Sequence, residues 1–313
     1  MRPEILRLED RIVETQATLV RIEQSLARDI AQLRHEVAAV HPPLTPFGCP
    51  MPDGTLLVQT VHGNRYLIDP LDVVMGPELI VQRQWEREIS ALLLSAATKD
   101  LVFVDVGANF GYFTCLLGGR IGRGGAGRIY SIEPNPACVS LLRRNVEINW
   151  SMCPIEICDC AVGDRSGVVN LFVPANHSAN AYLGDAHNKD WTGFPAHEVK
   201  VRRLDEIVAS DGVVDLMKID VEGHEHSVLT GARNVIARSP RLRIVMEWSP
   251  DQMIRAGYSP ERMLGLLREL GLRASRLESD FSPERLLAGA LSDDQLLSLG
   301  YNSVILTRRD YFV

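Results

Sequence analysis

The sequence has no excess of positive charge. Its formal net charge at pH 7 is −7 over 313 residues, and its isoelectric point is about 5.7. Proteins that bind nucleic acid or anionic membranes generally need a basic face, so this balance argues against both kinds of partner. We expect no nucleic acid among the partners.

Long apolar runs are also missing. The chain has no uninterrupted stretch of about 18 apolar residues, the length that a helix needs to cross a bilayer. The N-terminus is charged and amphipathic, without the apolar core of a signal peptide. We therefore expect a cytoplasmic protein that does not insert into membranes.

Cysteine pairs of the kind that bind zinc are absent as well. None of the six cysteines forms a C-x-x-C pair, and the one-residue spacing between Cys158 and Cys160 is not typical of zinc sites. We expect reduced, mostly buried thiols, as in a cytosolic protein. The length suits one large domain with an appendage.

The appendage is expected at the N-terminus. From Ile5 to Leu26 the residues of one stripe, all apolar except Thr15, recur at alternating steps of three and four, and after one extra step of four the pattern continues to Val40. The residues between them carry charges of both signs, which is typical of a coiled coil rather than of a membrane-surface helix. The pattern predicts an oligomerisation helix over residues 1–41 and a homo-oligomer, dimer or trimer, formed through residues 1–40. A helix folded back on its own domain is the alternative.

A linker and a small hairpin follow. Prolines and glycines end the first helix, and two short β-type runs joined by residues 62–64 are typical of a β-hairpin. We assign residues 42–76 to this linker and hairpin. Residues 77–313 form the main domain, whose first helix is expected over residues 77–97.

The central stretch of the main domain is residues 101–111, Leu-Val-Phe-Val-Asp-Val-Gly-Ala-Asn-Phe-Gly. It starts as an apolar run typical of a strand buried on both faces, ends in Asp105 and then breaks into a glycine turn before a helix. This order is typical of nucleotide sites. The G-x-G-x-x-G spacing of dinucleotide-binding loops is absent. An acid before the first glycine would repel a pyrophosphate but suits an ammonium group, and S-adenosylmethionine has an amino group, a sulfonium and no phosphate.

A second acid follows at the end of the next expected strand, residues 127–132. Glu133 lies about 20 residues beyond the glycine turn, where an acid can accept hydrogen bonds from a ribose diol. Asp105 and Glu133 are thus expected to hold the amino acid and sugar parts of S-adenosylmethionine. The alternative is that both acids only cap turns at strand ends.

A third strand, expected at residues 154–158, leads into Asp159 and Cys160. In a doubly wound sheet this strand end lies beside the adenine. Asp159 is expected to accept a hydrogen bond from the exocyclic amine, and a backbone amide at Cys160 or Ala161 to donate to the ring. A simple turn role for Asp159 is the alternative. The polar stretch 174–197 is long enough to be a binding loop.

The reaction chemistry is expected on the next buried strand, which runs from Leu216 toward Asp220. With a period of two, Lys218 and Asp220 share a face, and a lysine inside an apolar strand needs a carboxylate partner. The following strand ends at Glu247. If the two strands are neighbours, Asp220, Glu222 and Glu247 meet at the carboxyl edge of the sheet, close to the sulfonium.

Methyl transfer to a hydroxyl requires alignment with the sulfonium and removal of the hydroxyl proton. Asp220 is the first candidate for positioning or deprotonating the acceptor, and His224 is an alternative base because an imidazole ordinarily titrates near neutral pH. A divalent cation such as Mg²⁺, held by Asp220 and Glu247, would instead lower the pKa of the hydroxyl. A structural network around Lys218, with no acid–base role, is the remaining alternative.

Three motifs occur together in the main domain: Phe103-Val-Asp-Val-Gly-Ala-Asn-Phe-Gly-Tyr, Ile132-Glu-Pro-Asn, and Lys218-Ile-Asp-Val-Glu-Gly-His-Glu with Val228-Leu-Thr-Gly231. Over about residues 80–310 their combination resembles the FkbM family of S-adenosylmethionine-dependent methyltransferases. The resemblance implies an α/β fold with a doubly wound, Rossmann-like sheet of order 3-2-1-4-5-7-6 and an antiparallel strand seven. Strands six and seven would lie at residues 272–277 and 302–307.

The resemblance also implies the site residues. Those that would hold the cofactor are Asp105, Gly107, Ala108, Asn109, Gly111, Glu133 and Pro134. Those that would line the reaction edge are Lys218, Asp220, Glu222 and His224, with Asp220 also close to the cofactor.

The resemblance implies methylation of oxygen, as is general in that family. We therefore expect transfer to a hydroxyl of a sugar, a glycolipid or polysaccharide, or a glycosylated natural product. N- or C-methylation of a small molecule is an alternative, weakened by the lack of an Asn-Pro-Pro-Tyr-type motif. The alternative from another class is a catalytically silent scaffold that acts through the coiled coil.

Overall fold

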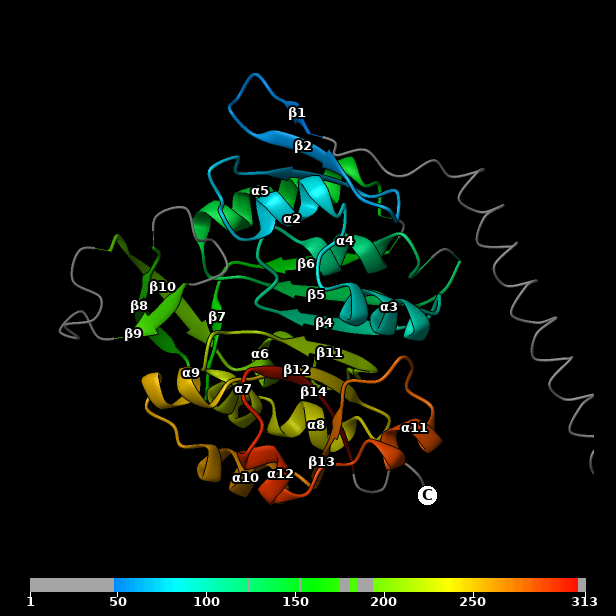
Figure 1. Ribbon diagram of the computed structural model, residues 1–313, viewed down its shortest axis with the longest axis vertical. Helices are drawn as coiled ribbons and strands as arrows, with labels where there is room; N and C mark the ends of the chain where they lie inside the picture. The colour runs from blue at the N-terminus through cyan, green and yellow to red at the C-terminus, as the bar shows by residue number, and fades with distance from the viewer. Residues whose placement is uncertain (1–47, 123, 152, 175–180, 185–193, 309–313) are drawn as a thin grey trace, which may run out of the picture. The chain divides into compact units, whose positions relative to one another are not determined.

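The computed structural model describes residues 48–308 except 123, 152, 175–180 and 185–193 (Figure 1). These residues belong to one compact unit, Pro46–Val313, which contains both the expected hairpin and the main domain. The expected coiled coil of residues 1–41 lies outside the described residues. Among the described helices, none is long and apolar enough to cross a membrane.

A seven-stranded sheet forms the centre of the fold. Its order is β13-β14-β12-β11-β4-β5-β6, which is 6-7-5-4-1-2-3 when the strands are numbered along the chain, the expected order read from the other edge. All neighbours pair in parallel except β14, which is antiparallel to both of its neighbours. The strands are β4 (Val102–Val106), β5 (Arg128–Ile132), β6 (Ile155–Cys158), β11 (Leu216–Ile219), β12 (Arg243–Trp248), β13 (Leu272–Arg276) and β14 (Asn302–Arg308).

Two separate apolar cores cover the two faces of this sheet, because successive residues of each strand point to opposite faces. One core holds Val104 and Met217 with side chains of α6 (Leu204–Ile207), α7 (Glu225–Gly231), α8 (Arg233–Arg238), α10 (Pro260–Glu269) and α12 (Asp293–Leu297). The other holds Phe103 and Leu216 with side chains of α3 (Arg87–Ala96), α4 (Tyr112–Gly118) and α11 (Pro283–Ala288). Two further helices are α5 (Pro136–Ile148) and α9 (Pro250–Arg255).

The segment before the central strand differs from the expectation. Instead of one helix over residues 77–97, the chain forms α2 (Met75–Val81) and α3 (Arg87–Ala96). Arg83 and Glu86 between them have φ values of 55° and 41°, in the left-handed region. The Tyr112 hydroxyl accepts a hydrogen bond from the backbone amide of Trp85, so a tertiary contact stabilises the non-helical segment between α2 and α3.

The helical segment that follows β11 is also divided. It forms α7 (Glu225–Gly231) and α8 (Arg233–Arg238), with Ala232 between them. A Cβ added at Gly231 would lie 2.0 Å from the carbonyl oxygen of Gly163, so α7 ends where its backbone packs tightly on the loop after β7.

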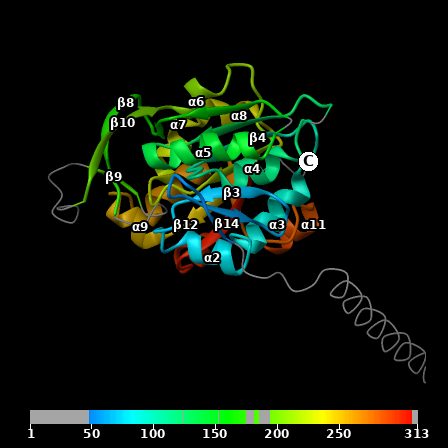
Figure 2. The ribbon, with the colours of Figure 1, turned by 90° about the horizontal axis from the view of Figure 1, so that it is seen from above.

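Two small sheets complete the described fold. The expected hairpin is β2 (Leu56–Gln59) and β3 (Arg65–Ile68), which form an antiparallel sheet with β1 (Cys49–Pro50) and contact α5. The second sheet has the order β7-β10-β8-β9 and lies beside the carboxyl ends of the central strands (Figure 1). Its strands are β7 (Ala161–Val162), β8 (Gly167–Phe172), β9 (Tyr182–Gly184) and β10 (Ala196–Arg202). Figure 2 shows the chain from above, with α6, α7 and α8 toward the top of the view and α2 toward the bottom.

Candidate active site

A single open cavity gathers most of the expected site residues. It lies at the carboxyl ends of β4, β5, β11 and β12 and encloses about 1120 Å³ of empty space, part of it continuous with solvent. Aromatic and aliphatic side chains form much of its wall, with carboxylates at several positions. The expected residues that line it are Gly107, Ala108, Asn109, Glu133, Pro134, Cys160, Lys218, Asp220, Glu222 and Glu247.

The glycine turn after β4 is shaped by close backbone packing. Gly107 has a φ of 81°, and a Cβ added there would lie 1.8 Å from the carbonyl oxygen of Asp220. Gly111 has a φ of 90°, and an added Cβ would lie 2.4 Å from Leu142 on α5. Gly107 therefore lets the ends of β4 and β11 meet at the cavity, whereas Gly111 starts α4 and does not line the cavity.

Glu133 is held in one orientation at the end of β5. The backbone amides of Asn109 and Asn135 donate hydrogen bonds of 2.8 Å to its Oε2 and Oε1, respectively. Burial raises the pKa of Glu133 to about 7, although both amides act in the opposite direction. Each oxygen keeps a lone pair, so the carboxylate can accept two further hydrogen bonds from a ligand in the cavity.

Asp105 does not lie where the sequence predicted. Its side chain is completely buried and does not line the cavity. Its Oδ2 accepts a 2.7 Å hydrogen bond from the Thr114 hydroxyl on α4. Asp105 shares the face of β4 that packs against α4, which explains why it lies beneath the cavity. The expected contact between Asp105 and an ammonium group stays a prediction, and the structure places the Asp105 carboxylate beneath the cavity rather than on its wall.

The expected ion pair on β11 is confirmed. The Nζ atom of Lys218 lies 2.7 Å from Oδ2 of Asp220 and 4.9 Å from the centroid of the Phe113 ring. Burial acts to lower the pKa of Lys218, but the neighbouring charges of Asp220, Glu86 and Asp105 outweigh it and raise the pKa. Lys218 is thus a fixed positive charge at the floor of the cavity.

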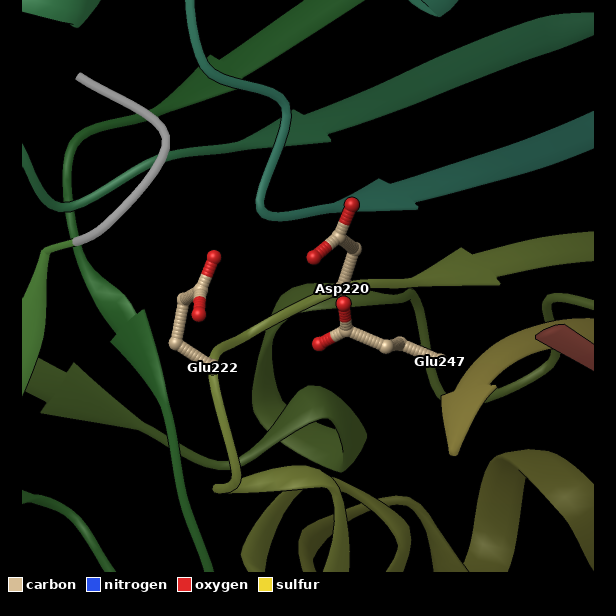
Figure 3. A group of neighbouring side chains, drawn as sticks. All are labelled: Asp220, Glu222 and Glu247. Atoms are coloured by element: carbon tan, nitrogen blue, oxygen red, sulfur yellow. The ribbon is translucent and has the colours of Figure 1, made fainter. Parts of the chain in front are cut away.

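Glu222 and Glu247 meet Asp220 at the sheet edge, as expected. One carboxylate oxygen from each of the three residues lies within 4.8 Å of the others, and Figure 3 shows the side chains converging from the end of β12 and the turn after β11. Burial and then the charge of Asp220 raise the pKa of Glu222 to about 8 and also raise the pKa of Glu247.

Glu86 is a cavity residue that the sequence did not reveal. It lines the cavity just before α3, and its Oε2 is buried without a hydrogen-bond partner. Burial raises its pKa, while the Lys218 charge acts to lower it. No sequence signal marked Glu86, because the backbone break that places it depends on the contact between Tyr112 and Trp85.

Two other expected residues lie away from the cavity. His224 does not line it, and its Nε2 donates a 3.1 Å hydrogen bond to the carbonyl oxygen of Leu183 on β9. Burial lowers the pKa of His224, so the ring is a neutral donor to the small sheet rather than a base facing the cavity. Asp159 is exposed outside the cavity, which agrees with its alternative role as a turn residue, while Cys160 lines the cavity.

The cysteines are free, as expected, and all but Cys49 are buried. Burial raises the pKa of Cys158 to about 11 and that of Cys160 to about 12. These two thiols therefore carry protons at neutral pH. In the described part of the chain, the group of side chains with spacing suited to a metal contains carboxylates and no cysteine.

The chain matches known proteins over this same region. A family model described as the methyltransferase FkbM domain matches residues 105–274. The hexuronic acid methyltransferase AglP of Haloferax volcanii is 30% identical over 190 residues, 60% of this chain and 70% of that protein. Methyltransferase sdnD of Sordaria araneosa is 24% identical over 209 residues, 58% of this chain and 77% of that protein. The 2-O-methyltransferase NoeI of Sinorhizobium fredii is 25% identical over 151 residues, 44% of this chain and 59% of that protein.

The family match contains the glycine turn, Glu133 and the three carboxylates at the sheet edge, and it covers more than half of the chain. The cavity and its position at the carboxyl ends of a parallel sheet agree with that match. The chain therefore belongs to the FkbM-domain family of methyltransferases.

Proposed function

We propose that this protein is an S-adenosylmethionine-dependent O-methyltransferase that acts on a hydroxyl of a sugar, a glycolipid or polysaccharide, or a glycosylated natural product. The observation that carries the proposal is Glu133, a buried carboxylate that two backbone amides hold at the cavity wall. A carboxylate fixed in this way is suited to a ribose diol, the part of S-adenosylmethionine that offers two adjacent hydroxyl donors.

The residues that line the cavity indicate where the other parts of the cofactor would bind. Cys160, Ala161 and Val162 give an apolar wall beside Glu133 that suits the adenine ring. The methionine part then extends toward Asp220. Because Asp105 lies beneath the cavity, Glu86 is the carboxylate that would receive the ammonium group, and its Oε2 has no other partner.

Asp220 is the residue that we assign to the acceptor. Its Oδ2 is paired with Lys218, yet 29% of its side chain remains exposed at the cavity. It lies at the end of β11, beside the glycine turn that would hold the cofactor. From there it would align the acceptor hydroxyl with the sulfonium methyl and accept its proton, as methyl transfer to oxygen requires.

The relatives support oxygen on a sugar-like acceptor. One is named for a hexuronic acid and another for 2-O-methylation. A third, the 31-O-demethyl-FK506 methyltransferase FkbM of Streptomyces tacrolimicus, is 29% identical over 174 residues. These names describe the relatives, and they favour a hydroxyl over nitrogen or carbon for this chain.

Location and assembly are part of the proposal. The free cysteines support the expected cytoplasmic location. The heptad pattern of residues 1–40 supports a homo-oligomer.

A two-step experiment tests the proposed function. Calorimetric titration with S-adenosylmethionine should show one site per chain in the wild type and strongly reduced affinity in Glu133→Gln. Extracts of a deletion strain, incubated with the enzyme and methyl-labelled S-adenosylmethionine, should then yield an O-methylated carbohydrate by mass spectrometry. Asp220→Ala should bind the cofactor but lose roughly 10²–10⁴-fold in transfer rate, the contribution of a general base. Full transfer by Asp220→Ala would refute its role, and no binding by the wild type would refute the function.

A further inference from the structure

Asp220, Glu222 and Glu247 form a compact group of carboxylates, here termed the carboxylate triad. They come from three different positions at the sheet edge: the end of β11, the turn that follows it and β12. One oxygen from each lies within 4.8 Å of the other two, and Figure 3 shows the three side chains directed toward a common space. The backbone around Asp220 and Glu222 is closely packed, since an added Cβ at Gly107 or Gly223 would overlap a neighbouring carbonyl oxygen.

Two members of the triad have an outer partner that holds them by one oxygen. Lys218 pairs with Asp220, and the side-chain amide of Gln252 donates to Oε2 of Glu222. In metal sites, such partners orient the ligands and leave their other oxygens for the ion. Asp220 and Glu222 have this arrangement.

Glu247 gives a second and independent indication of a ligand. The residue is only 7% exposed, it lines the cavity, and its Oε2 has no hydrogen-bond partner. A buried carboxylate oxygen without a partner is unfavourable because it has lost its hydration and gained nothing in exchange. A cation beside it would restore that interaction.

The cavity around the triad has more carboxyl groups than positive charges, which also favours a bound cation. Among the described residues that line the cavity, Lys218 is the sole lysine or arginine, and Asp220 already pairs with it. Glu86 and Glu133 add two more carboxyl groups to the same lining. A doubly charged ion at the triad would offset repulsion that one lysine cannot.

We propose that the carboxylate triad binds one divalent cation of the oxygen-preferring kind, such as Mg²⁺ or Mn²⁺. Metal–oxygen distances of about 2.0–2.4 Å place opposite ligands of an octahedral ion about 4.0–4.8 Å apart, so the spread of the three oxygens is compatible with a single ion. Three protein ligands leave about three positions of a six-coordinate ion, and these face the cavity.

The use of the cation depends on the proposed function, but its binding does not. An acceptor hydroxyl that occupies one of the open positions would lose its proton more readily, because the ion stabilises the alkoxide. Asp220 would then be a ligand that positions the hydroxyl beside the sulfonium. Two neighbouring acceptor oxygens could occupy two positions, which favours a sugar with adjacent hydroxyls.

Equilibrium dialysis of the untagged full-length chain with Mn²⁺ tests the proposal, with bound S-adenosylmethionine measured separately by calorimetry. The wild type should bind one Mn²⁺ per chain, and Mg²⁺ should displace it. Glu247→Gln and Glu222→Gln should each weaken Mn²⁺ binding at least tenfold while retaining the cofactor, which shows that the cavity is folded. Glu133→Gln is the matched control: it removes a carboxylate from the same cavity, and it should weaken the cofactor and leave Mn²⁺ binding unchanged.

Two outcomes would overturn the site. One is a wild type that binds S-adenosylmethionine but no Mn²⁺, with or without the cofactor, which would leave the proposed function intact. The other is equal Mn²⁺ affinity in the wild type and in both triad variants. A wild type that binds Mn²⁺ through the triad but no S-adenosylmethionine would support the site and refute the proposed function instead.

Discussion

Lys218 and Asp220 form a 2.7 Å ion pair at the carboxyl end of β11, with the lysine buried and the aspartate partly open to the cavity. The side chain of Lys218 stands over the Phe113 ring, and its Cα is paired in register with that of Asp105 on β4. The lysine is therefore a counter-charge for acids on two neighbouring strands.

Removal of this counter-charge should destabilise the fold. We expect Lys218→Met to lower the free energy of unfolding by about 2–3 kcal/mol, because it leaves buried acids without their cation. The double variant Lys218→Met/Asp220→Asn should recover part of that loss, since it also removes a negative charge. Urea denaturation measures both effects. A single variant as stable as the wild type would show that the pair contributes nothing.

Gly107 packs so closely on the end of β11 that one added methyl group should lower both stability and cofactor affinity. Gly107→Ala should lower the free energy of unfolding by about 3 kcal/mol or more and abolish cofactor binding, because its Cβ would overlap the Asp220 carbonyl oxygen at a positive φ. Gly119→Ala is the control: it follows α4 with ordinary helical angles and open space around its Cα. It should change stability by no more than about 0.5 kcal/mol. Thermal denaturation and calorimetry together decide the result, and a Gly107→Ala variant that binds normally would contradict the packing argument.

Cofactor binding should depend on pH through Glu133. Its pKa of about 7 means that the carboxylate gains a proton as the pH falls below neutrality. If the ionised form accepts both ribose hydroxyls, affinity for the ligand should weaken roughly tenfold from pH 8 to pH 6. The ligand of choice is 5′-methylthioadenosine, which has the ribose diol but no amino group that titrates. Glu133→Gln should bind weakly at every pH, and a wild-type affinity that is constant or improves toward pH 6 would argue against the contact.

The N-terminal heptads predict the assembly state. Deletion of residues 1–40 should reduce the particle size in solution, measured by sedimentation equilibrium, and leave S-adenosylmethionine affinity unchanged. The reason is that the predicted apolar stripe needs a partner helix, while the cavity residues that the structure describes all follow Val73. An unchanged mass after deletion would reject residues 1–40 as the oligomerisation segment.

Much of the fold was predictable from local patterns. Buried apolar runs that end in an acid or a glycine turn marked β4, β5 and β11, and their carboxyl ends meet at one edge for topological reasons. For that reason the sequence pattern alone could place Glu133, Asp220, Glu222 and Glu247 together. Period-two alternation also predicted the pairing of Lys218 with Asp220.

The structure differs from the expectation where side-chain direction or a long-range contact decides where a residue lies. Asp105 shares the face of Phe103, so the alternation within β4 already directs it toward α4, away from a ligand. The position of Glu86 in the cavity depends on a helix break that Tyr112 stabilises. Tyr112 follows Glu86 by 26 positions, so the residues around Glu86 do not reveal the break. His224 donates a hydrogen bond to the carbonyl oxygen of Leu183 on β9, which lies 41 positions earlier in the chain.

A crystal structure of the full chain soaked with S-adenosylmethionine would show whether Glu133 and Asp220 have the roles proposed for them. We expect both ribose hydroxyls within hydrogen-bond distance of Glu133 and the sulfonium methyl directed toward Asp220. A cofactor bound outside this cavity, or a Glu133 side chain with no contact to the ribose, would contradict this expectation.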